Sequence, residues 1–304
     1  MICPRTVVAA TLVAGVGLAE PMRIGVDDAG RAKAIFADPA MTAAFRDIGF
    51  DFIMFHVWRS NDVETVDALD RWAAEHGVGF FINQENADKQ PGDPERYRRP
   101  GRFFQPSPEF VRRCLDSPRF LGVCYDEAEH WIMNGVFVTS RKHALTEFMP
   151  HFHDAEGGTL QSAYEGNLHN LRVLMDSVYA GFARPPGTVP VVSTEHVFPV
   201  LFHLFARAGI SPFPKYLKES VTPVIAAMAL GAAKQYGTAV VPCLDLWGPG
   251  PDWPAHTPEE LESALLFAYW TGSPATYVEN LSYRDSLYSV RPDGTHALTP
   301  WGEA

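Results

Sequence analysis

Basic residues are too few in this sequence to make its surface cationic. Lys and Arg number 25 against 36 Asp and Glu, so the 304-residue chain carries a formal net charge of -11. Nucleic acids and anionic membrane surfaces are bound through basic patches. The small cluster Arg96, Arg98, Arg99 and Arg102 is interrupted by Pro and Gly. We therefore expect neither nucleic acid nor a membrane surface as the partner.

Cysteine is also scarce. The four cysteines form neither a CxxC motif nor a Cys/His spacing of the kind that holds structural zinc. Two of them, Cys124 and Cys243, lie inside apolar runs, where cysteine acts as a small buried hydrophobe. We expect a scaffold without disulfide bonds, and no cofactor.

Long hydrophobic runs are confined to the N-terminus. Residues 1–20 combine a short basic start, an apolar stretch of small residues and Gly17-Leu18-Ala19 before Glu20. This is the pattern of a secretory signal peptide. No other run approaches the ~18 apolar residues of a spanning helix. We expect a secreted or periplasmic protein with one catalytic domain over 21–304 and no membrane association after cleavage.

Apolar runs alternate with helical patterns along the rest of the chain. Because the runs are continuous rather than alternating, each strand is expected to be covered on both faces in a parallel sheet. A weak eighth run lies at 213–220; the seven clear runs are 22–28, 50–58, 78–86, 120–127, 189–196, 238–248 and 275–281. Eight such units in under 300 residues predict a (β/α)₈ TIM barrel. The competing doubly wound sheet needs a Gly-rich phosphate loop after the first strand, and GVDDAGR has no GxGxxG.

Two segments depart from this rhythm. Residues 139–188 are longer than one crossover needs, so we expect two helices there, over 139–152 and 159–182. The tail PDGTHALTPWGEA predicts a turn and then the start of a helix, and we expect the barrel to lack its closing C-terminal helix.

Acidic and aromatic residues collect at the ends of the predicted strands, as in FLGVCYDEAEHW, where an apolar run ends in Asp126 and Glu127. In a (β/α)₈ barrel these ends meet at one mouth, the site of catalysis. Individual members have simpler roles: Asp27 or Asp28 can cap the next helix, and His56 can be a hydrogen-bonded core residue. Several acids that meet at one mouth repel one another, however, and such a cluster therefore indicates a functional site.

Carboxylates among Trp, Tyr, Asn and His suit a saccharide. Indole rings stack on the apolar faces of a sugar, and cleavage of its O-glycosidic bond needs one protonated and one ionised carboxyl group. Crowding at a partly apolar mouth separates the pKa values of neighbouring acids in the required way.

The sequence resembles the TIM-barrel glycoside hydrolases over roughly residues 22–304. The motifs are FLGVCYDE, which is similar to their fourth strand, the block from WGPGPDW to ATYVEN, and the closing phrase LTPWGEA. In several such families the acid/base ends strand four, which corresponds to Glu127. The partner often lies on strand seven, where this chain has Asp245; the run 189–196 offers Glu195 instead.

The resemblance therefore implies a glycosidase with Glu127 as general acid and Glu195 as its partner. Asp126, Asp245 and Glu279 are supporting candidates. The residues expected to bind the carbohydrate substrate are Asp28, His56, Trp58, Asn83, Glu85, Tyr125, His130, Trp131, His196 and Trp247.

Two other functions fit the same mouth. A metal-dependent isomerase or hydrolase would use strand-end ligands such as Glu127, His196, Glu279 and Asp28, although the first strand lacks a His-x-His pair. A glycan-binding barrel would hold the sugar without cleaving it.

Overall fold

The structure is a computed structural model. It describes residues 21–28, 34–57, 62–84, 106–126, 159–176, 179–182, 184–186, 188–196, 199–217, 221–246, 256–281 and 286–304.

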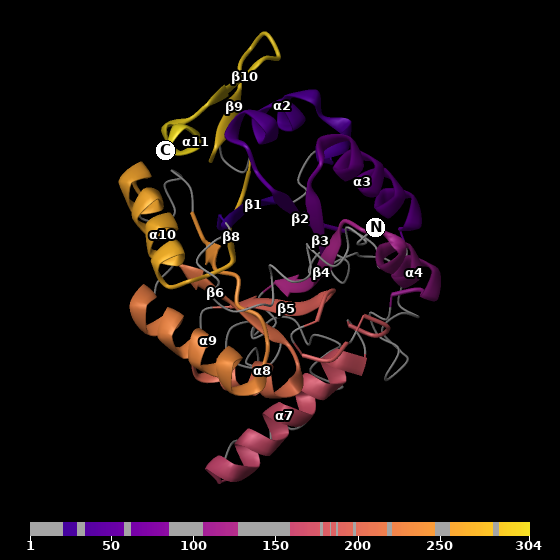
Figure 1. Cartoon of the computed structure of the whole chain (residues 1–304), viewed down its shortest axis with the longest axis vertical. Helices are drawn as coiled ribbons and strands as arrows, with labels where there is room; N and C mark the ends of the chain where they lie inside the picture. The colour runs from indigo at the N-terminus through magenta and orange to yellow at the C-terminus, as the bar shows by residue number, and fades with distance from the viewer. Residues whose placement is uncertain are drawn as a thin grey trace, which may run out of the picture.

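Eight parallel strands form a closed barrel at the centre of the molecule (Figure 1). Each strand pairs with its neighbours in sequence, and the barrel closes where Arg23 pairs with Ala275. The strands are β1 (Arg23–Asp28), β2 (Phe52–His56), β3 (Gly79–Asn83), β4 (Phe120–Asp126), β5 (Val191–His196), β6 (Ser211–Tyr216), β7 (Cys243–Leu244) and β8 (Ala275–Val278). The predicted TIM barrel is confirmed, and the doubly wound sheet is excluded because β1 pairs with β8.

Helices lie around the barrel, between consecutive strands (Figure 1). They are η1 (Ile35–Ala37), α2 (Pro39–Ile48), α3 (Val63–His76), α4 (Pro108–Asp116), α7 (Leu160–Asp176), η5 (Pro199–Leu201), α8 (Phe202–Ala208), α9 (Thr222–Tyr236) and α10 (Pro258–Trp270). Local signals set their ends. The Asp62 side chain accepts the Thr65 amide at the start of α3, and Gly77 ends that helix at φ 73°. Thr257 and Glu260 form a reciprocal capping box at the start of α10.

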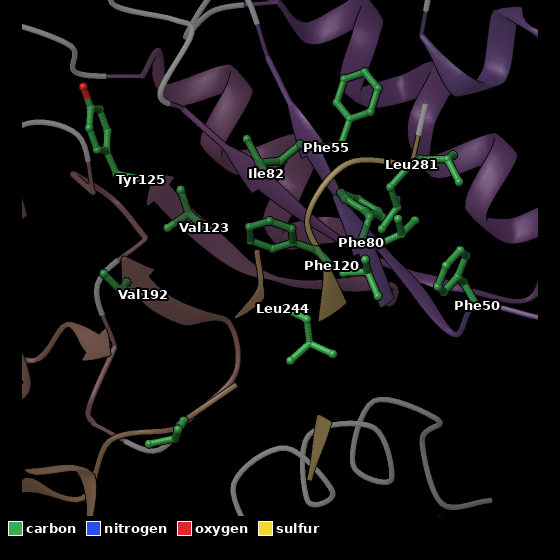
Figure 2. Close-up of a cluster of buried hydrophobic side chains, with 14 of the residues drawn as sticks. Phe50, Phe55, Phe80, Ile82, Phe120, Val123, Tyr125, Val192, Leu244 and Leu281 are labelled. Atoms are coloured by element: carbon green, nitrogen blue, oxygen red, sulfur yellow. The ribbon is translucent and has the colours of Figure 1, made fainter. Parts of the chain in front are cut away.

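The two-residue period of the strands divides the core into two clusters. The inner cluster fills the barrel interior and consists of Phe52, Met54, Phe81, Leu121, Cys124, Val191, Phe213, Ala239, Val241, Cys243, Ala275 and Tyr277. The alternate residues belong to the outer cluster, which packs the barrel against its helices. Figure 2 shows part of it, including Phe80 and Phe120, whose rings lie 5.7 Å apart.

Close packing of β4 on β5 depends on a glycine. A Cβ atom at Gly122 would lie 2.3 Å from the carbonyl oxygen of Val191, closer than any side chain tolerates. The motif "apolar run, glycine, apolar run" in β4 therefore has a structural cause.

Proline shapes the weakest part of the barrel. The predicted strand over 238–248 is reduced to the two residues of β7, which follow Pro242, a residue without an amide donor. The Pro242 carbonyl still accepts the Tyr277 amide at 3.0 Å. The weak run predicted at 213–220 is a true strand, shifted to 211–216.

The long segment before β5 and the tail are partly described. The expected helix over 159–182 is α7, which ends at Asp176; the expected helix over 139–152 lies outside the described residues. At the tail, the predicted turn connects two short strands that the sequence did not predict, β9 (Tyr288–Val290) and β10 (His296–Leu298). The helix start follows as α11 (Pro300–Glu303).

Two further expectations concern cysteines and membranes. The described cysteines, Cys114, Cys124 and Cys243, are all free and buried, as predicted. Among the described residues, no helix combines the length and apolar character needed to cross a membrane. The predicted signal peptide lies outside the described part of the chain.

Candidate active site at the carboxyl end of the barrel

At the carboxyl end of the barrel, one polar residue in or directly after each of the eight strands points inward. Each follows the inner-facing apolar positions by the two-residue period of its strand. We call this set the mouth ring; its members are Asp27, His56, Asn83, Asp126, Glu195, Lys215, Asp245 and Glu279. Nearly all of them are buried, and only Asp126 and Glu279 keep some exposure, at 10% and 12% of their side chains.

Lys215 connects half of the mouth ring. Its Nζ lies 2.9 Å from Glu279 Oε2 and 3.4 Å from Asp126 Oδ1. The same atom lies 3.5 Å from Asp245 Oδ2 and 3.7 Å from Glu195 Oε2. One ammonium thus faces carboxylates from β4 and β5 and from the residues that follow β7 and β8. Buried carboxylates at such distances from one another need a shared cation.

A hydrogen-bond chain connects the other half. His56 Nε2 lies 2.9 Å from Asp27 Oδ2 and 3.1 Å from Asn83 Nδ2. The Asn83 side-chain oxygen accepts the backbone amide of Asp126 at 3.3 Å. The Asp126 amide fixes the orientation of the Asn83 side chain. His56 Nε2 carries either a proton or a lone pair, so it donates to Asp27 or accepts from Asn83, one at a time. The contact with His56 also explains the position of Asp27, which pairs with histidine rather than capping a described helix.

Glu195 is fully enclosed in the ring. Its side chain has no exposed surface, and neither carboxyl oxygen has a hydrogen-bond partner within the described part of the chain. Burial, reinforced by the negative charge of Asp126 and only partly offset by Lys215, raises the pKa of Glu195 well above its ordinary value of 4.5. Glu195 therefore holds a proton under conditions in which an exposed glutamate is ionised.

The inner cluster meets the ring at three weakly polar residues. Burial raises the pKa of the Cys124 and Cys243 thiols and of the Tyr277 hydroxyl, with further contributions from nearby acids including Glu195. Cys243 Sγ lies 3.6 Å from Glu279 Oε2. One oxygen each of Glu195 and Glu279 and the Cys243 sulfur lie within 4.8 Å of one another. These neighbours keep the lower side of the ring uncharged.

That spacing also raises the question of a metal ion. Two carboxylates and a thiol at such distances have the dimensions of a ligand set. The Lys215 ammonium, however, is in ion-pair contact with both carboxylates. A cation belonging to the chain already neutralises this position, so we assign no metal site to it.

Six of the residues predicted for the site join the mouth ring: Glu195, Asp126, Asp245, Glu279, His56 and Asn83. Two described residues do not join it. Tyr125 belongs to the outer cluster, because it alternates with the inward-facing Cys124 and Asp126 (Figure 2). Asp28 is buried next to Asp27 at the end of β1, on the opposite phase of the strand.

The remaining predicted site residues cannot be placed. Those outside the described residues are Glu127, Trp58, Glu85, His130, Trp131 and Trp247. His196 ends β5, but its side chain is outside the description.

Sequence reasoning missed Lys215 as a site residue. Its strand was recognised only weakly because Pro212 and Pro214 interrupt the apolar run. The signal that identifies Lys215 is the two-residue period: it follows the buried Phe213 by two positions, as Glu195 follows Ser193. A lysine on the inner phase of a parallel strand can be buried only with acidic partners.

The comparisons with known proteins do not identify a family. No family model and no curated protein matches the chain. Similar solved structures include a glutamate-to-glutamine mutant of Saccharomyces cerevisiae Gas2 in complex with laminaritetraose and laminaripentaose, with 11% identity and a TM-score of 0.45. That match covers 92% of this chain and 61% of Gas2. Gas2 with another bound compound has 11% identity and a TM-score of 0.47, covering 93% and 64%.

Citrate synthase SbnG has 11% identity and a TM-score of 0.40, covering 85% of this chain and 86% of its own. The chain spans less than two thirds of the length of Gas2. At these scores the likenesses carry no functional argument. The chain's own strand pairing and ring define its class as a (β/α)₈ barrel with an acid-rich mouth.

Proposed function

We propose that this protein is a glycoside hydrolase that cleaves an oligo- or polysaccharide outside the cytoplasm with two carboxyl groups of the barrel mouth. The observation that carries the proposal is the pairing of Glu195, whose pKa is raised, with Glu279, which is hydrogen-bonded to Lys215 at 2.9 Å. A protonated and an ionised carboxyl group side by side are what glycosidic cleavage requires.

The charge of the ring favours the same reaction. Asp126, Asp245 and Glu279 face one ammonium, so the ring has an excess of negative charge even when Glu195 is protonated. Glycosidic cleavage passes through an oxocarbenium-like transition state that is positively charged. Fixed negative charges in a water-poor site stabilise such a state more than they stabilise a neutral sugar.

The carboxyl separation argues against inversion of configuration. One oxygen of Glu195 and one of Glu279 lie within 4.8 Å. Retaining enzymes keep their carboxyl groups about 5–5.5 Å apart, whereas inverting enzymes need roughly 6.5–9.5 Å to admit a water molecule. In this assignment Glu195 donates the proton to the leaving oxygen and Glu279 is the nucleophile. A sugar entering the mouth meets Asp126 and Glu279 first, with Glu195 behind them.

The sequence-based assignment differs in one residue and in the role of Glu195. It makes Glu127 the acid and Glu195 the partner, and Glu127 directly follows Asp126 outside the described part of the chain. Three variants separate the assignments: Glu127→Gln, Glu195→Gln and Glu279→Gln, with the exposed Glu259→Gln of α10 as the control. Loss of an acid/base group lowers kcat by about 10²–10⁴. The two variants that lose most turnover while retaining sugar affinity identify the pair.

The experiment starts from a panel of chromogenic glycosides and natural glucans, assayed before and after exhaustive chelation. Turnover that survives chelation and that falls in two of the three variants supports the proposal. Sugar binding without turnover in any form would make the protein a glycan-binding barrel. Activity lost on chelation and restored by a divalent ion would indicate the metal-dependent alternative.

A further inference from the structure

Lys215 faces more acids than it has protons to donate. An ammonium group has three N–H donors, and four carboxylates lie within 2.9–3.7 Å of this one. Glu279 receives a hydrogen bond, whereas Glu195 is the most distant of the four and has no hydrogen bond on either oxygen. The geometry therefore separates Glu279, the nearest and hydrogen-bonded acid, from Glu195, the most distant one.

The surroundings of Glu195 leave no other described group to make that distinction. The charges that act on Glu195 include those of Asp126, Lys215, Glu279 and Asp27. Asp245 faces the same ammonium, and Cys124, Cys243 and Tyr277 lie beneath. Asp27 is paired with His56 on the far side. Among these neighbours only Lys215 favours the ionised form of Glu195, and all the acids favour the protonated form. Burial acts in the same direction as the acids.

Two other roles for Lys215 fit less well. A nucleophilic lysine needs a lowered pKa, produced by cationic neighbours or an apolar pocket, and four acids surround this one. A lysine that only stabilises the fold would be costly, because a buried ion pair is often no more stabilising than packed apolar residues. A role in arranging the acids accounts for both the burial and the number of contacts.

We propose that Lys215 is the positioning residue of this site, and that its three N–H donors determine which acid of the mouth ring carries the proton. Glu279, hydrogen-bonded to the ammonium, stays ionised, and Glu195, left without a hydrogen bond, keeps the proton. The consequence for catalysis rests on the proposed function, while the proton assignment does not.

The catalytic test uses two substitutions of Lys215 that should move the alkaline limb of the pH–rate profile in opposite directions. Glu195 must be protonated to act as the acid, so the rate falls as pH rises through its pKa. Lys215→Met removes the group that favours the ionised form, and the alkaline limb should move to higher pH. Lys215→Arg supplies five N–H donors in a fork and should reach Glu195 as well. A hydrogen bond to Glu195 favours its ionised form, so the alkaline limb should move to lower pH.

Lys234→Met, in the exposed face of α9 after β6, is the control and should leave the profile unchanged. A purely structural lysine would lower activity or stability without moving the limb. Folded Lys215 variants with an unmoved alkaline limb therefore overturn the proposal.

A second measurement needs neither activity nor a Lys215 variant. Carbon-13 and nitrogen-15 NMR on the wild-type protein, with the Glu195 signal assigned through Glu195→Gln, follows the carboxyl carbons and the lysine ammonium between pH 4 and 9. We expect Lys215 to be charged throughout, Glu279 to titrate first and Glu195 last. A neutral Lys215 at pH 7 refutes the assignment, and so does a Glu195 that ionises at a lower pH than Glu279. If no glycoside is cleaved but this order holds, the proposed function fails and the role of Lys215 stands.

Discussion

Two adjacent layers of the barrel interior are built from opposite kinds of side chain. The inner cluster is almost wholly apolar and includes the fully buried Phe52, Phe81 and Phe213. The mouth ring lies two residues further along the same strands. Its side chains are almost all charged or carry an amide, and they are nearly as buried as those of the inner cluster. The first layer can only stabilise the fold. The second layer lowers stability through desolvation and charge repulsion. Such a loss of stability is usual at binding and catalytic sites.

The largest expected loss of stability comes from a substitution in the inner cluster. Phe213→Ala removes a ring with no exposed surface that packs edge-on to Phe81. The cavity should lower the free energy of unfolding by about 3–5 kcal/mol, measured by urea denaturation. Trp270→Ala, at a side chain with 76% exposure, is the control and should change stability by less than about 0.5 kcal/mol. Similar losses in both would mean that the inner cluster is not the stabilising layer.

A smaller loss is expected within the ring. Asn83→Ala removes the bridge between His56 Nε2 and the Asp126 amide. Leaving those groups without their partner should cost about 1–3 kcal/mol, again measured by denaturant unfolding. The exposed Gln161→Ala of α7 should stay within about 0.5 kcal/mol. An unchanged stability in Asn83→Ala would show that the ring's hydrogen bonds are not made in solution.

A change of opposite sign is expected at Glu195. Its folded-state pKa lies above the unfolded value, so folding becomes less favourable as pH rises from about 4.5 through the folded pKa. Glu195→Gln should remove this loss, so the variant gains stability relative to wild type as pH increases. Denaturant midpoints at pH 4, 6 and 8 test the difference.

Glu259 provides the matched contrast. Hydrogen bonds from its own backbone amide and from Thr257 lower the pKa of this exposed glutamate. Its contribution is present above the unfolded pKa and is lost as pH falls, so Glu259→Gln should give no gain at high pH. Equal behaviour of the two variants would contradict the buried, protonated state of Glu195.

The smallest effect concerns the boundary between the layers. Burial raises the pKa of the Cys124 and Cys243 thiols, and thiolate is the reactive form. Neither should react with an aromatic disulfide reagent at pH 8 until the protein unfolds. Peptide mapping after brief labelling identifies the modified positions. Labelling of Cys243 in the native protein would mean that solvent reaches the floor of the ring.

Much of the barrel followed from local patterns. The strand β4 differs from its prediction only by Glu127. The shortened β7 and the displaced β6 did not follow, because proline removes ladder donors at positions where hydrophobicity still indicates a strand. The hairpin β9–β10 was missed because its strands have three residues each.

The sequence by itself determined the succession of strands and helices along the chain, the helix caps and the presence of acids at the strand ends, since these depend on residues close together in the chain. Only the tertiary structure decided that Tyr125 faces the helices and that Lys215 meets four acids. Those contacts join residues up to 89 positions apart through the closure and stagger of the barrel. Which residues meet depends on the direction of each side chain and on the register of the strands. A run of apolar residues in the sequence specifies neither.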